Sequence, residues 1–327
     1  MKCSPGQLIR QIPFDDVIDD LLDEYEDYIN RKYEEDSMKK KLMKIMVTGS
    51  HGFVGNATKK YVDKIADVEW IDYDLMNKRD VRDRDQVEWV MREYSPDKVL
   101  HLAAIARFAE ADNDPLLAHE TNVIGTMNVV DACKKYHIPL VHASTGSAIM
   151  PLNAYEPPYT EEIPARGNSV YGTTKAIAEC YVRKLTPHIV LRYAHLYGAE
   201  KRFHGLIGGF LSRIERGLAP ELYGGKQTNS FVYIEDVARA NWIALTAAPD
   251  KWNQIYNIGS TEELSAADAG KVVCDVFGYK GEIDIKEQRT VDASRFQFDI
   301  SKSKRMLGWE PQYTFEQGIR AMKKVMG

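Results

Sequence analysis

A group of hydroxyl-bearing side chains ends an apolar segment near the middle of the chain. The segment 140-LVHASTGSAIM-150 begins as an apolar run and then carries hydroxyl groups at Ser144, Thr145 and Ser147. A hydroxyl group both donates and accepts hydrogen bonds, so each of the three is suited to hold a substrate oxygen. Which of them does so, and in which reaction, depends on the chemistry of their neighbours.

Tyr171 and Lys175 form a second pattern that is suited to chemistry. They are four residues apart in 169-SVYGTTKAIAE-179, and this spacing places both on one face of a helix. The ordinary pKa of tyrosine is about 10, so the phenol acts as a base at neutral pH only where its surroundings lower that pKa. A neighbouring lysine cation supplies part of the required field. Because Tyr-x-x-x-Lys is common on helices, the pair alone does not establish a catalytic site.

Three glycines near the start of the regular part of the chain indicate a phosphate-binding loop. In 48-TGSHGFVG-55 they are Gly49, Gly52 and Gly55, between a predicted strand and a predicted helix. Glycine permits a tight turn and lets backbone N–H groups approach a pyrophosphate, which the helix N-terminus stabilises. An ordinary strand–helix turn can show the same spacing. The position between strand and helix favours a dinucleotide site.

An acidic residue ends the next predicted strand. Asp72 directly follows the apolar run of this strand, seventeen residues after Gly55. A carboxylate there accepts hydrogen bonds from the adenosine ribose and repels a 2′-phosphate, which favours NAD over NADP. Asp74 also fits the spacing and is the alternative.

Strands and helices that alternate along the chain must position these residues. This order predicts an α/β fold, a parallel sheet covered by helices on both faces. The predicted strands are 44–49, 68–72, 98–104, 139–144 and 188–193, and the predicted helices are 52–65, 85–94, 115–136 and 170–185. After about residue 196 the pattern predicts a helix at 205–217, a strand at 230–234, a helix from Asp236 and a C-terminal helix after Phe315.

The chain is expected to have three parts. Residues 1–43 form an acidic N-terminal extension, in which apolar residues recur at helical spacing between Phe14 and Ile29. This helix is expected to dock on its own domain or on a second subunit; recruitment of a basic partner is the alternative. Residues 44–195 form the nucleotide-binding domain, and residues 196–327 form mainly a smaller substrate-binding lobe.

Composition narrows the class of protein. The net charge of the 327 residues is −5, and no basic stripe is suited to nucleic acid or to an anionic membrane. No apolar run is long enough to span a bilayer. The four cysteines are scattered without a paired spacing, which favours free thiols in a reducing cytoplasm. The histidines show no spacing that predicts a metal site.

Taken in order, these motifs resemble the extended short-chain dehydrogenases/reductases, in particular the NAD-dependent sugar-nucleotide epimerases and dehydratases. The resemblance runs from Lys44 to the C-terminus and implies a Rossmann-type, doubly wound sheet and NAD as cofactor. It also rests on 101-HLAAIA-106, 121-TNVIGT-126, 191-LRYAHLYG-198 and 299-DISKSKRMLGWEP-311. The cofactor-binding residues that it implies are Gly49, Gly52, Phe53, Val54, Gly55, Asp72, Asp80, Val81, Leu102, Ala103, Ala104, Asn122, Ser144, Tyr171, Lys175 and Tyr193.

The same resemblance implies catalytic roles. Tyr171 would take the proton of a sugar hydroxyl while a hydride passes from the same carbon to NAD⁺. Lys175 would hold the nicotinamide ribose and lower the pKa of Tyr171. Thr145, or failing that Ser144, would hydrogen-bond the oxygen that becomes a carbonyl. A shift of register by one residue would place Gly146 at that position, and the need for a hydroxyl favours Thr145.

The substrate side departs from the family pattern at two positions. Asn229 stands where an arginine commonly pairs with the substrate pyrophosphate, although Lys226 offers a nearby charge and Arg289 matches a second arginine of this kind. A surface ion pair is the alternative role for Arg289. His195 replaces the usual asparagine and either reshapes the pocket or is a satisfied polar residue. The expected substrate-binding residues are Thr145, Ser147, His195, Asn229 and Arg289.

The residues after Thr145 bear on the reaction. Dehydratases of the family commonly have Asp-Glu there, whereas this chain has Gly146 and Ser147, which cannot exchange protons usefully at neutral pH. The sequence therefore predicts a nucleotide-sugar 4-epimerase that works through a transient 4-keto intermediate. A dehydrogenase or ketoreductase of the same fold is the enzymatic alternative, and a non-catalytic NAD-binding scaffold is the other class. The family resemblance also implies a homodimer that pairs through helices 115–136 and 170–185.

Overall fold

A computed structural model describes residues 24–29, 42–150, 154–185, 187–199, 205–287 and 295–326. The chain divides into two compact units, residues 1–42 and residues 43–327. In the first unit, residues 24–29 are helical, which agrees with the C-terminal end of the predicted amphipathic helix. The rest of that prediction, from Phe14, lies outside the described residues.

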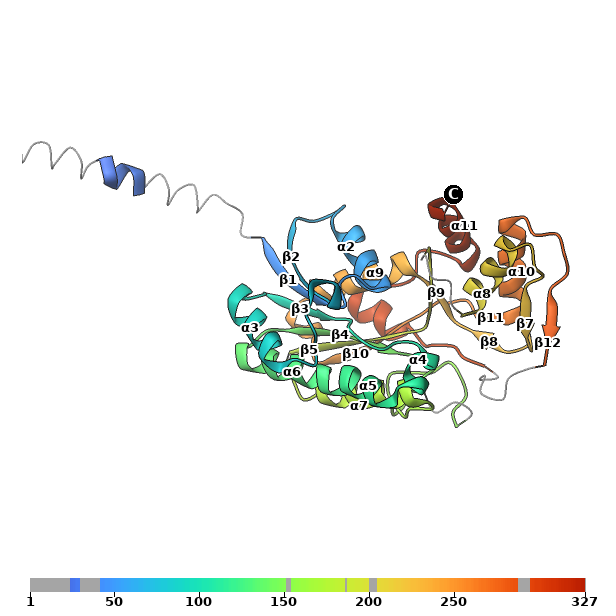
Figure 1. Ribbon diagram of the computed structural model, residues 1–327, viewed down its shortest axis with the longest axis horizontal. Helices are drawn as coiled ribbons and strands as arrows, with labels where there is room; N and C mark the ends of the chain where they lie inside the picture. Colours follow the sequence, from blue (N-terminus) through green and yellow to red (C-terminus); the bar gives the residue numbers. More distant parts are fainter. Residues whose placement is uncertain are drawn as a thin grey trace, which may run out of the picture. The chain divides into compact units, whose positions relative to one another are not determined.

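The second unit is built on a six-stranded parallel sheet (Figure 1). Its strand order is β10-β5-β4-β3-β1-β2. The strands are β1 Met43–Thr48, β2 Val68–Tyr73, β3 Lys98–His101, β4 Leu140–Thr145, β5 His188–Tyr193 and β10 Gln254–Ile258. From β1 the chain passes to β2 on one side, and after β2 it crosses to β3 on the other side of β1. The strand order therefore reverses at β1. Ligands of such sheets bind beyond the carboxyl ends of the strands at this reversal, where the glycine loop follows β1.

Helices cover both faces of the sheet, as the alternating pattern predicts. Helices α2 (Phe53–Val62) and α9 (Ile234–Leu245) pack together on one face, and α3 (Arg84–Tyr94), α6 (Gly125–Tyr136) and α7 (Val170–Val182) lie on the other (Figure 1). All six residues of β5 are buried, because a strand between two helical layers has no solvated face. The predicted doubly wound parallel sheet is confirmed.

The predicted helix 115–136 is interrupted by a segment with π-helical bonding. It consists of α5 (Pro115–His119), the π segment Glu120–Ile124 and α6. A short helix, α4 (Phe108–Asn113), precedes it and was not predicted from the sequence. A single π turn inside an α-helix shifts the side chains that follow it and is frequent at functional sites.

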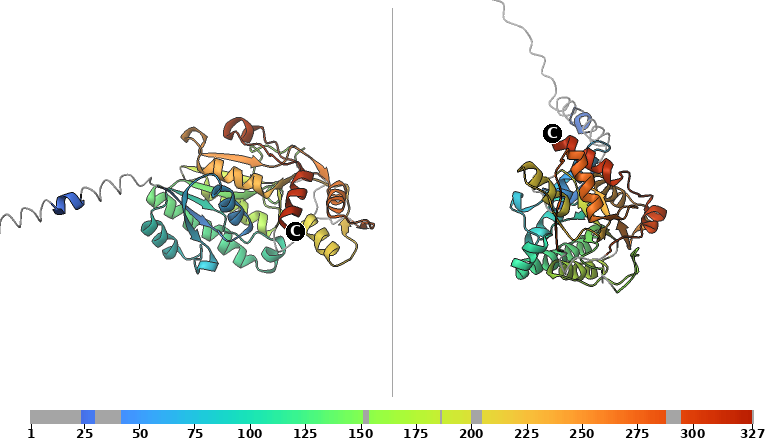
Figure 2. Two further views of the ribbon diagram at one scale, coloured as in Figure 1. Left: turned by 90° about the horizontal axis from the view of Figure 1, so that it is seen from above. Right: turned by 90° about the vertical axis from the view of Figure 1, so that its right-hand side faces the viewer.

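A smaller lobe stands at one end of the sheet (Figure 2). It contains α8 (Gly205–Glu215), α10 (Ala266–Phe277) and α11 (Phe315–Met326), which share one hydrophobic cluster. Its two-stranded pairs are β6 (His195–Tyr197) with β9 (Phe231–Tyr233), β7 (Glu221–Tyr223) with β12 (Asp284–Lys286), and β8 (Thr228–Asn229) with β11 (Leu264–Ser265). Short 3-10 or π turns occupy Leu75–Asn77, Pro249–Lys251 and Ser303–Leu307.

The residues after position 195 divide between the sheet and the lobe. Helix α9 and strand β10 belong to the sheet layers although they lie late in the chain. The strand predicted at 230–234 is β9, which pairs with β6 and not with the main sheet. In the described part of the chain, no helix is long and apolar enough to cross a membrane.

Candidate active site

Strand β4 and helix α7 bring Thr145 and Tyr171 together. Strand β4 ends at Thr145, and α7 begins at Val170 after Ser169, whose hydroxyl accepts a hydrogen bond from the Gly172 amide at 3.0 Å. The Thr145 hydroxyl interacts with the phenol of Tyr171 and acts to lower its pKa. The two residues therefore share one position at which an oxygen atom of a substrate can be held.

Ser144 points to a different part of the molecule. Its hydroxyl donates to the carboxylate of Glu179 at 3.0 Å, and Glu179 forms a buried ion pair with Arg192 at 2.6 Å. The Ser144 hydroxyl is thus engaged by Glu179, two turns after Tyr171 on α7, whereas Thr145 is the residue that acts on the Tyr171 phenol. The geometry favours Thr145, with Ser144 in a structural network, and Gly146 has no side chain to offer.

Lys175 lies one turn after Tyr171 in the interior of α7. Its side chain is 4% exposed, and burial lowers its pKa to about 8, against the opposing charge of Glu179. Its ammonium lies 3.5 Å from Nε2 of His142 on β4. At neutral pH the amine remains mainly protonated, so it places a positive charge on the same helix face as the phenol.

Burial makes the phenol of Tyr171 hard to ionise. Burial raises its pKa, and the hydrogen bond with Thr145 acts in the opposite direction. The ring of Phe108, from α4, contacts the Tyr171 ring edge to face at a centroid distance of 5.5 Å. A base role for Tyr171 therefore needs positive charge beside the phenol.

The glycine loop has the close packing that a dinucleotide site requires. Gly49 has a φ of +68°, and a Cβ atom there would lie 2.8 Å from the Ala103 amide nitrogen. A Cβ atom on Gly55 would lie 2.6 Å from the Gly49 carbonyl oxygen. Gly52 precedes the first helical residues, Phe53 and Val54. The N-terminus of α2 is thus held with no side chain in its way, which fits a bound pyrophosphate.

The end of β3 is tied to this loop. The Thr48 hydroxyl accepts from the amides of Leu102 and Ala103 at 3.1 and 3.2 Å. Ala104 follows them in the same partly buried turn. The predicted residues of 102–104 therefore border the glycine loop, as a phosphate site between β1 and β3 requires.

Both candidate ribose acids lie on the α2 side of β2, and both have partners. Burial would raise the pKa of Asp72, but hydrogen bonds from Lys59 and Ser50 lower it overall, and the Lys59 ammonium lies 2.7 Å away. Asp74 accepts from the amide of His51, in the glycine loop, at 3.1 Å. Asp74 therefore contacts the glycine loop through the His51 amide, whereas Asp72 interacts both with Ser50 of the loop and with Lys59 of α2.

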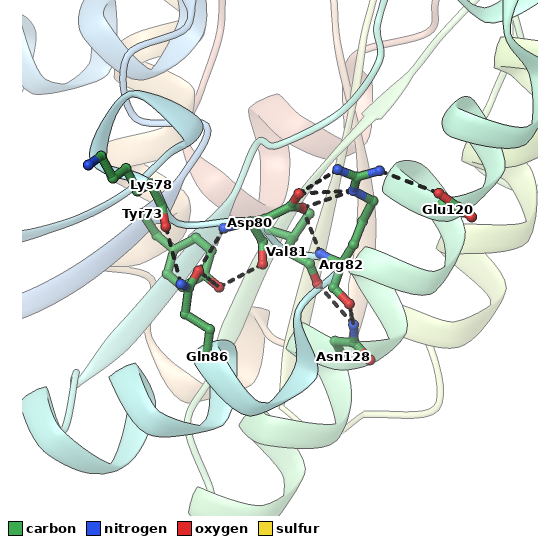
Figure 3. A network of polar contacts seen from close by, with 8 residues as sticks. All are labelled: Tyr73, Lys78, Asp80, Val81, Arg82, Gln86, Glu120 and Asn128. Carbon is green, nitrogen blue, oxygen red and sulfur yellow. Dashed lines mark hydrogen bonds and ion pairs between the residues drawn. The ribbon is translucent and has the colours of Figure 1, made fainter.

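Asp80 and Val81, expected at the adenine, are fixed by a polar network (Figure 3). The Arg82 guanidinium pairs with the Asp80 carboxylate at 2.6 Å, and the side-chain amide of Asn128 donates to the Val81 carbonyl oxygen at 2.9 Å. The Asp80 amide donates to the Gln86 side chain at 2.7 Å. These bonds set the path of the backbone beside α6.

Two other residues predicted to bind the cofactor have side chains that are hydrogen-bonded to other parts of the protein. Asn122, fully buried in the π segment, accepts from the Ile105 amide at 2.8 Å and donates to the Thr174 hydroxyl at 2.9 Å. It thereby fixes the loop after β3 against α7. The Tyr193 hydroxyl donates to the Asn241 side chain at 2.5 Å. Tyr193 thus connects β5 to α9.

The predicted substrate residues are placed only in part. Ser147 Oγ and His195 Nε2 are 3.5 Å apart, and burial lowers the pKa of His195 to about 4. Asn229 lies in β8, partly buried. Arg289 lies outside the described residues.

Aromatic rings cover the position that follows Thr145. A Cβ atom on Gly146 would lie 2.8 Å from Cζ of Phe296 and 2.9 Å from Cε2 of Phe298. Both phenyl rings are buried, and Phe296 also contacts the His195 ring at 5.5 Å. A larger side chain at position 146 would have to displace these rings.

Comparison with known proteins agrees with this fold and geometry. The sequence model of the NAD dependent epimerase/dehydratase family matches residues 45–259. The chain belongs to this family. NAD is therefore its cofactor, as the sequence predicts, and the glycine loop fits it.

Relatives within the family carry out different reactions. The chain is 31% identical over 300 residues to a candidate UDP-glucose 4-epimerase of Methanocaldococcus jannaschii, covering 84% of this chain and 96% of the relative. It is 27% identical over 331 residues to the dTDP-glucose 4,6-dehydratase of Haemophilus influenzae, covering 86% and 97%. The structure of Thermotoga maritima UDP-glucose 4-epimerase with UDP-glucose matches with a TM-score of 0.78 at 27% identity, covering 87% of this chain and 100% of that one.

Three residues beside the site were not predicted from the sequence: Phe108, His142 and Phe296. His142 left a signal, because it is a polar residue inside an otherwise apolar strand, two positions before Ser144. Phe108 and Phe296 left none, since an aromatic residue in a segment without a clear period is usually part of a core. Their distance from Tyr171 and Gly146 in the sequence hides the contacts that the fold creates.

Proposed function

We propose that this protein is an NAD-dependent 4-epimerase of a nucleotide sugar. The observation that carries the proposal is the packing around Gly146, where Phe296 and Phe298 fill the space of any larger side chain. Expelling water from a sugar requires an acid and a base beside the reacting carbons. Gly146 and Ser147 provide neither, which favours reversible hydride transfer over elimination.

The proposed mechanism assigns each proton to a residue. Tyr171 takes the proton of the sugar 4-hydroxyl as the hydride leaves the same carbon, which becomes a ketone. Bound NAD supplies the hydride acceptor at nicotinamide C4 and, once reduced, the donor for the return step. Thr145 hydrogen-bonds the reacting oxygen throughout. After the ketone turns over, the hydride returns to its opposite face and Tyr171 gives back the proton, so no net oxidation occurs.

The electrostatics of the site tie the base to the cofactor. Burial raises the pKa of Tyr171 in the ligand-free chain, so the phenolate needs compensating positive charge. The Lys175 ammonium and the positive charge of the oxidised nicotinamide ring would supply it together. We expect Lys175 also to hold the nicotinamide ribose, a role that the family resemblance implies for this lysine.

The nucleotide-sugar substrate is proposed from similarity and from the position of the lobe. Thr145, Ser147 and His195 lie at the carboxyl end of the sheet, where β6 leads into the lobe. Asn229 and Arg289 are the proposed contacts to the substrate phosphates. The division into a nucleotide-binding domain, 44–195, and a mainly substrate-binding lobe, 196–327, is part of this proposal.

We further infer a homodimer. The expected interface helices carry exposed apolar side chains, with Leu116 of α5 68% exposed and Tyr181 of α7 38% exposed. The scattered cysteines support a reducing, cytoplasmic setting.

The experiment that tests the function uses the purified protein without added cofactor. It is incubated with a panel of UDP-, GDP-, CDP- and dTDP-sugars, and products are separated by chromatography while NADH is followed by absorbance. We expect epimer formation without net NADH. Stoichiometric NADH only when NAD⁺ is added would replace the proposal by a dehydrogenase, and a 4-keto-6-deoxy product would replace it by a dehydratase. Bound NAD without turnover of any sugar would support a scaffold.

A further inference from the structure

His142 is a buried imidazole directly behind the proposed catalytic lysine. It is the third residue of β4, it has no exposed surface, and its Nε2 atom lies 3.5 Å from Nζ of Lys175. Within the described ranges, the Lys175 ammonium has no other side-chain hydrogen-bond partner. An ammonium can only donate, so the imidazole nitrogen that faces it must be the acceptor.

The second nitrogen of His142 is left without a partner. When Nε2 accepts, the ring proton sits on Nδ1, and that atom is buried and makes no hydrogen bond in the described structure. A buried donor without an acceptor costs stability, and an apolar residue would fill this place in the strand without that cost. Packing therefore does not explain the imidazole, and its contact with Lys175 does.

The neighbouring histidine shows the contrast. His101 lies on β3 with its ring centroid 5.3 Å from that of His142. Its Nδ1 lies 2.6 Å from the Thr48 hydroxyl and its Nε2 lies 2.9 Å from the Thr126 hydroxyl. Both nitrogens of His101 thus tie structural elements together. Of these two histidines, His142 is the one that directs a nitrogen at Lys175.

We propose that His142 is a positioning residue for Lys175: its imidazole accepts a hydrogen bond from the ammonium and holds that cation in place beneath the cofactor and Tyr171. The proposal rests on the catalytic role proposed for Tyr171 and Lys175. Because His142 belongs to β4, an inner strand of the sheet, it can hold the long lysine side chain from a fixed position.

The charged and titratable groups around Lys175 lie on α7 itself and on the neighbouring strands β3 and β5. Glu179 lies one turn further along α7 and is itself bound to Arg192 of β5. His101 of β3 and His188 of β5 act on His142, and burial lowers the pKa of both. These imidazoles are therefore neutral at neutral pH, and within the described residues it is the His142 nitrogen that lies within hydrogen-bonding distance of the ammonium.

The matched pair His142→Gln and His142→Met tests the proposal. The two side chains are similar in length, but glutamine keeps a hydrogen-bond acceptor and methionine does not. The readout is the pH midpoint at which cyanate carbamylates Lys175 in the ligand-free protein, followed by peptide mass spectrometry with the exposed Lys184 as internal reference. Cyanate reacts only with the neutral amine, so this midpoint reports the pKa of Lys175.

We expect a midpoint near the pKa of about 8 in the wild-type protein. His142→Met should lower it by about one pH unit, the size of shift that loss of a hydrogen bond to the charged form can produce. His142→Gln should stay near the wild type, and so should His188→Phe, which removes another buried imidazole of the sheet. A midpoint that is the same in the methionine and glutamine variants would overturn the proposal, since a merely structural histidine would affect both alike.

Nitrogen NMR of histidine-labelled wild-type protein gives a second test that needs no stable variant. We expect His142 as the tautomer with its proton on Nδ1, and a proton on Nε2 would refute the hydrogen bond. Neither measurement uses a sugar or turnover. If no sugar of the panel is converted, the proposed function fails, but the role of His142 is still decided by these two measurements.

Discussion

The ionisation of Tyr171 is set by neighbours that act in opposite directions. Burial raises its pKa and the hydrogen bond with Thr145 lowers it. We expect Tyr171→Phe to reduce kcat for epimerisation at least ~1,000-fold, within the range of about 10²–10⁴ that a positioned general base contributes. Bound NAD, measured by absorbance after denaturation, should remain. A variant with wild-type kcat would rule out Tyr171 as the base.

Thr145 and Ser144 are adjacent hydroxyls with different environments. Thr145→Val should lower kcat by about 10- to 1,000-fold, because the reacting oxygen loses a hydrogen bond. Ser144→Ala should keep kcat within about threefold but lower the melting temperature, since the buried Glu179 carboxylate loses a donor. Steady-state kinetics and thermal unfolding measure both effects. If the two variants exchanged these outcomes, the register of the site would be wrong by one residue.

At the scale of the element, the glycine loop and α2 form the unit that meets the cofactor. A Cβ atom added to Gly55 would lie 2.6 Å from the Gly49 carbonyl oxygen, whereas one added to Gly52 would lie 3.2 Å from the same oxygen. We expect Gly55→Ala to weaken NAD binding at least ~10-fold and to lower stability by about 1–3 kcal/mol, since backbone must shift.

Gly52→Ala is the matched control for the loss of stability. It adds the same methyl group in the same turn, and a shift of a few tenths of an ångström accommodates it. Chemical denaturation compares the stability of the two variants, and isothermal titration measures NAD binding by Gly55→Ala. Equal losses of stability in both would show that general loop flexibility matters, and not the contact between Gly55 and Gly49.

The predicted elements show where sequence patterns suffice. The periods of 52–65 and 170–185 identify α2 and α7, because each helix has one face on the sheet and one in solvent. Strand β10 has no comparable signal, since its place beside β5 is decided by tertiary packing after a long excursion through the lobe. The π segment before α6 also escapes, because a π turn changes hydrogen bonding and leaves the residue pattern nearly intact.

The candidate site follows the same rule. The sequence could point to Thr145, Tyr171 and Lys175 as candidates because two short motifs contain them. The bond of Asp74 to the glycine loop, the Lys59 partner of Asp72 and the rings over Gly146 were not predictable, because they join segments far apart in the chain. No residue spacing encodes such contacts.

At the scale of the whole unit, the sheet and the lobe are connected by shared elements and by buried polar groups. Asn241 of α9 accepts from Tyr193 of β5 and donates to the Thr58 hydroxyl of α2 at 2.9 Å. Asp236, at the start of α9, accepts from the amides of Gln312 and Tyr313 at 2.8 and 3.1 Å, just before α11 of the lobe begins. Helix α9 thus joins helix α2, the sheet and the lobe through buried hydrogen bonds.

Buried neutral histidines predict that the folded unit loses stability in acid. Burial lowers the pKa of His101 to about 3 and that of His195 to about 4, both below the ordinary value of 6.5. The unfolded chain therefore binds more protons than the folded one between those values and about pH 6.5. The free energy of unfolding should be unaffected by these groups above pH 7 and should fall as the pH drops toward 4, by on the order of 2 kcal/mol for each. Urea unfolding from pH 7 to pH 4.5 measures how steeply the free energy of unfolding falls with pH. The substitution His195→Asn should make this slope shallower. A slope that the substitution leaves unchanged would mean that His195 takes up its proton without unfolding the site.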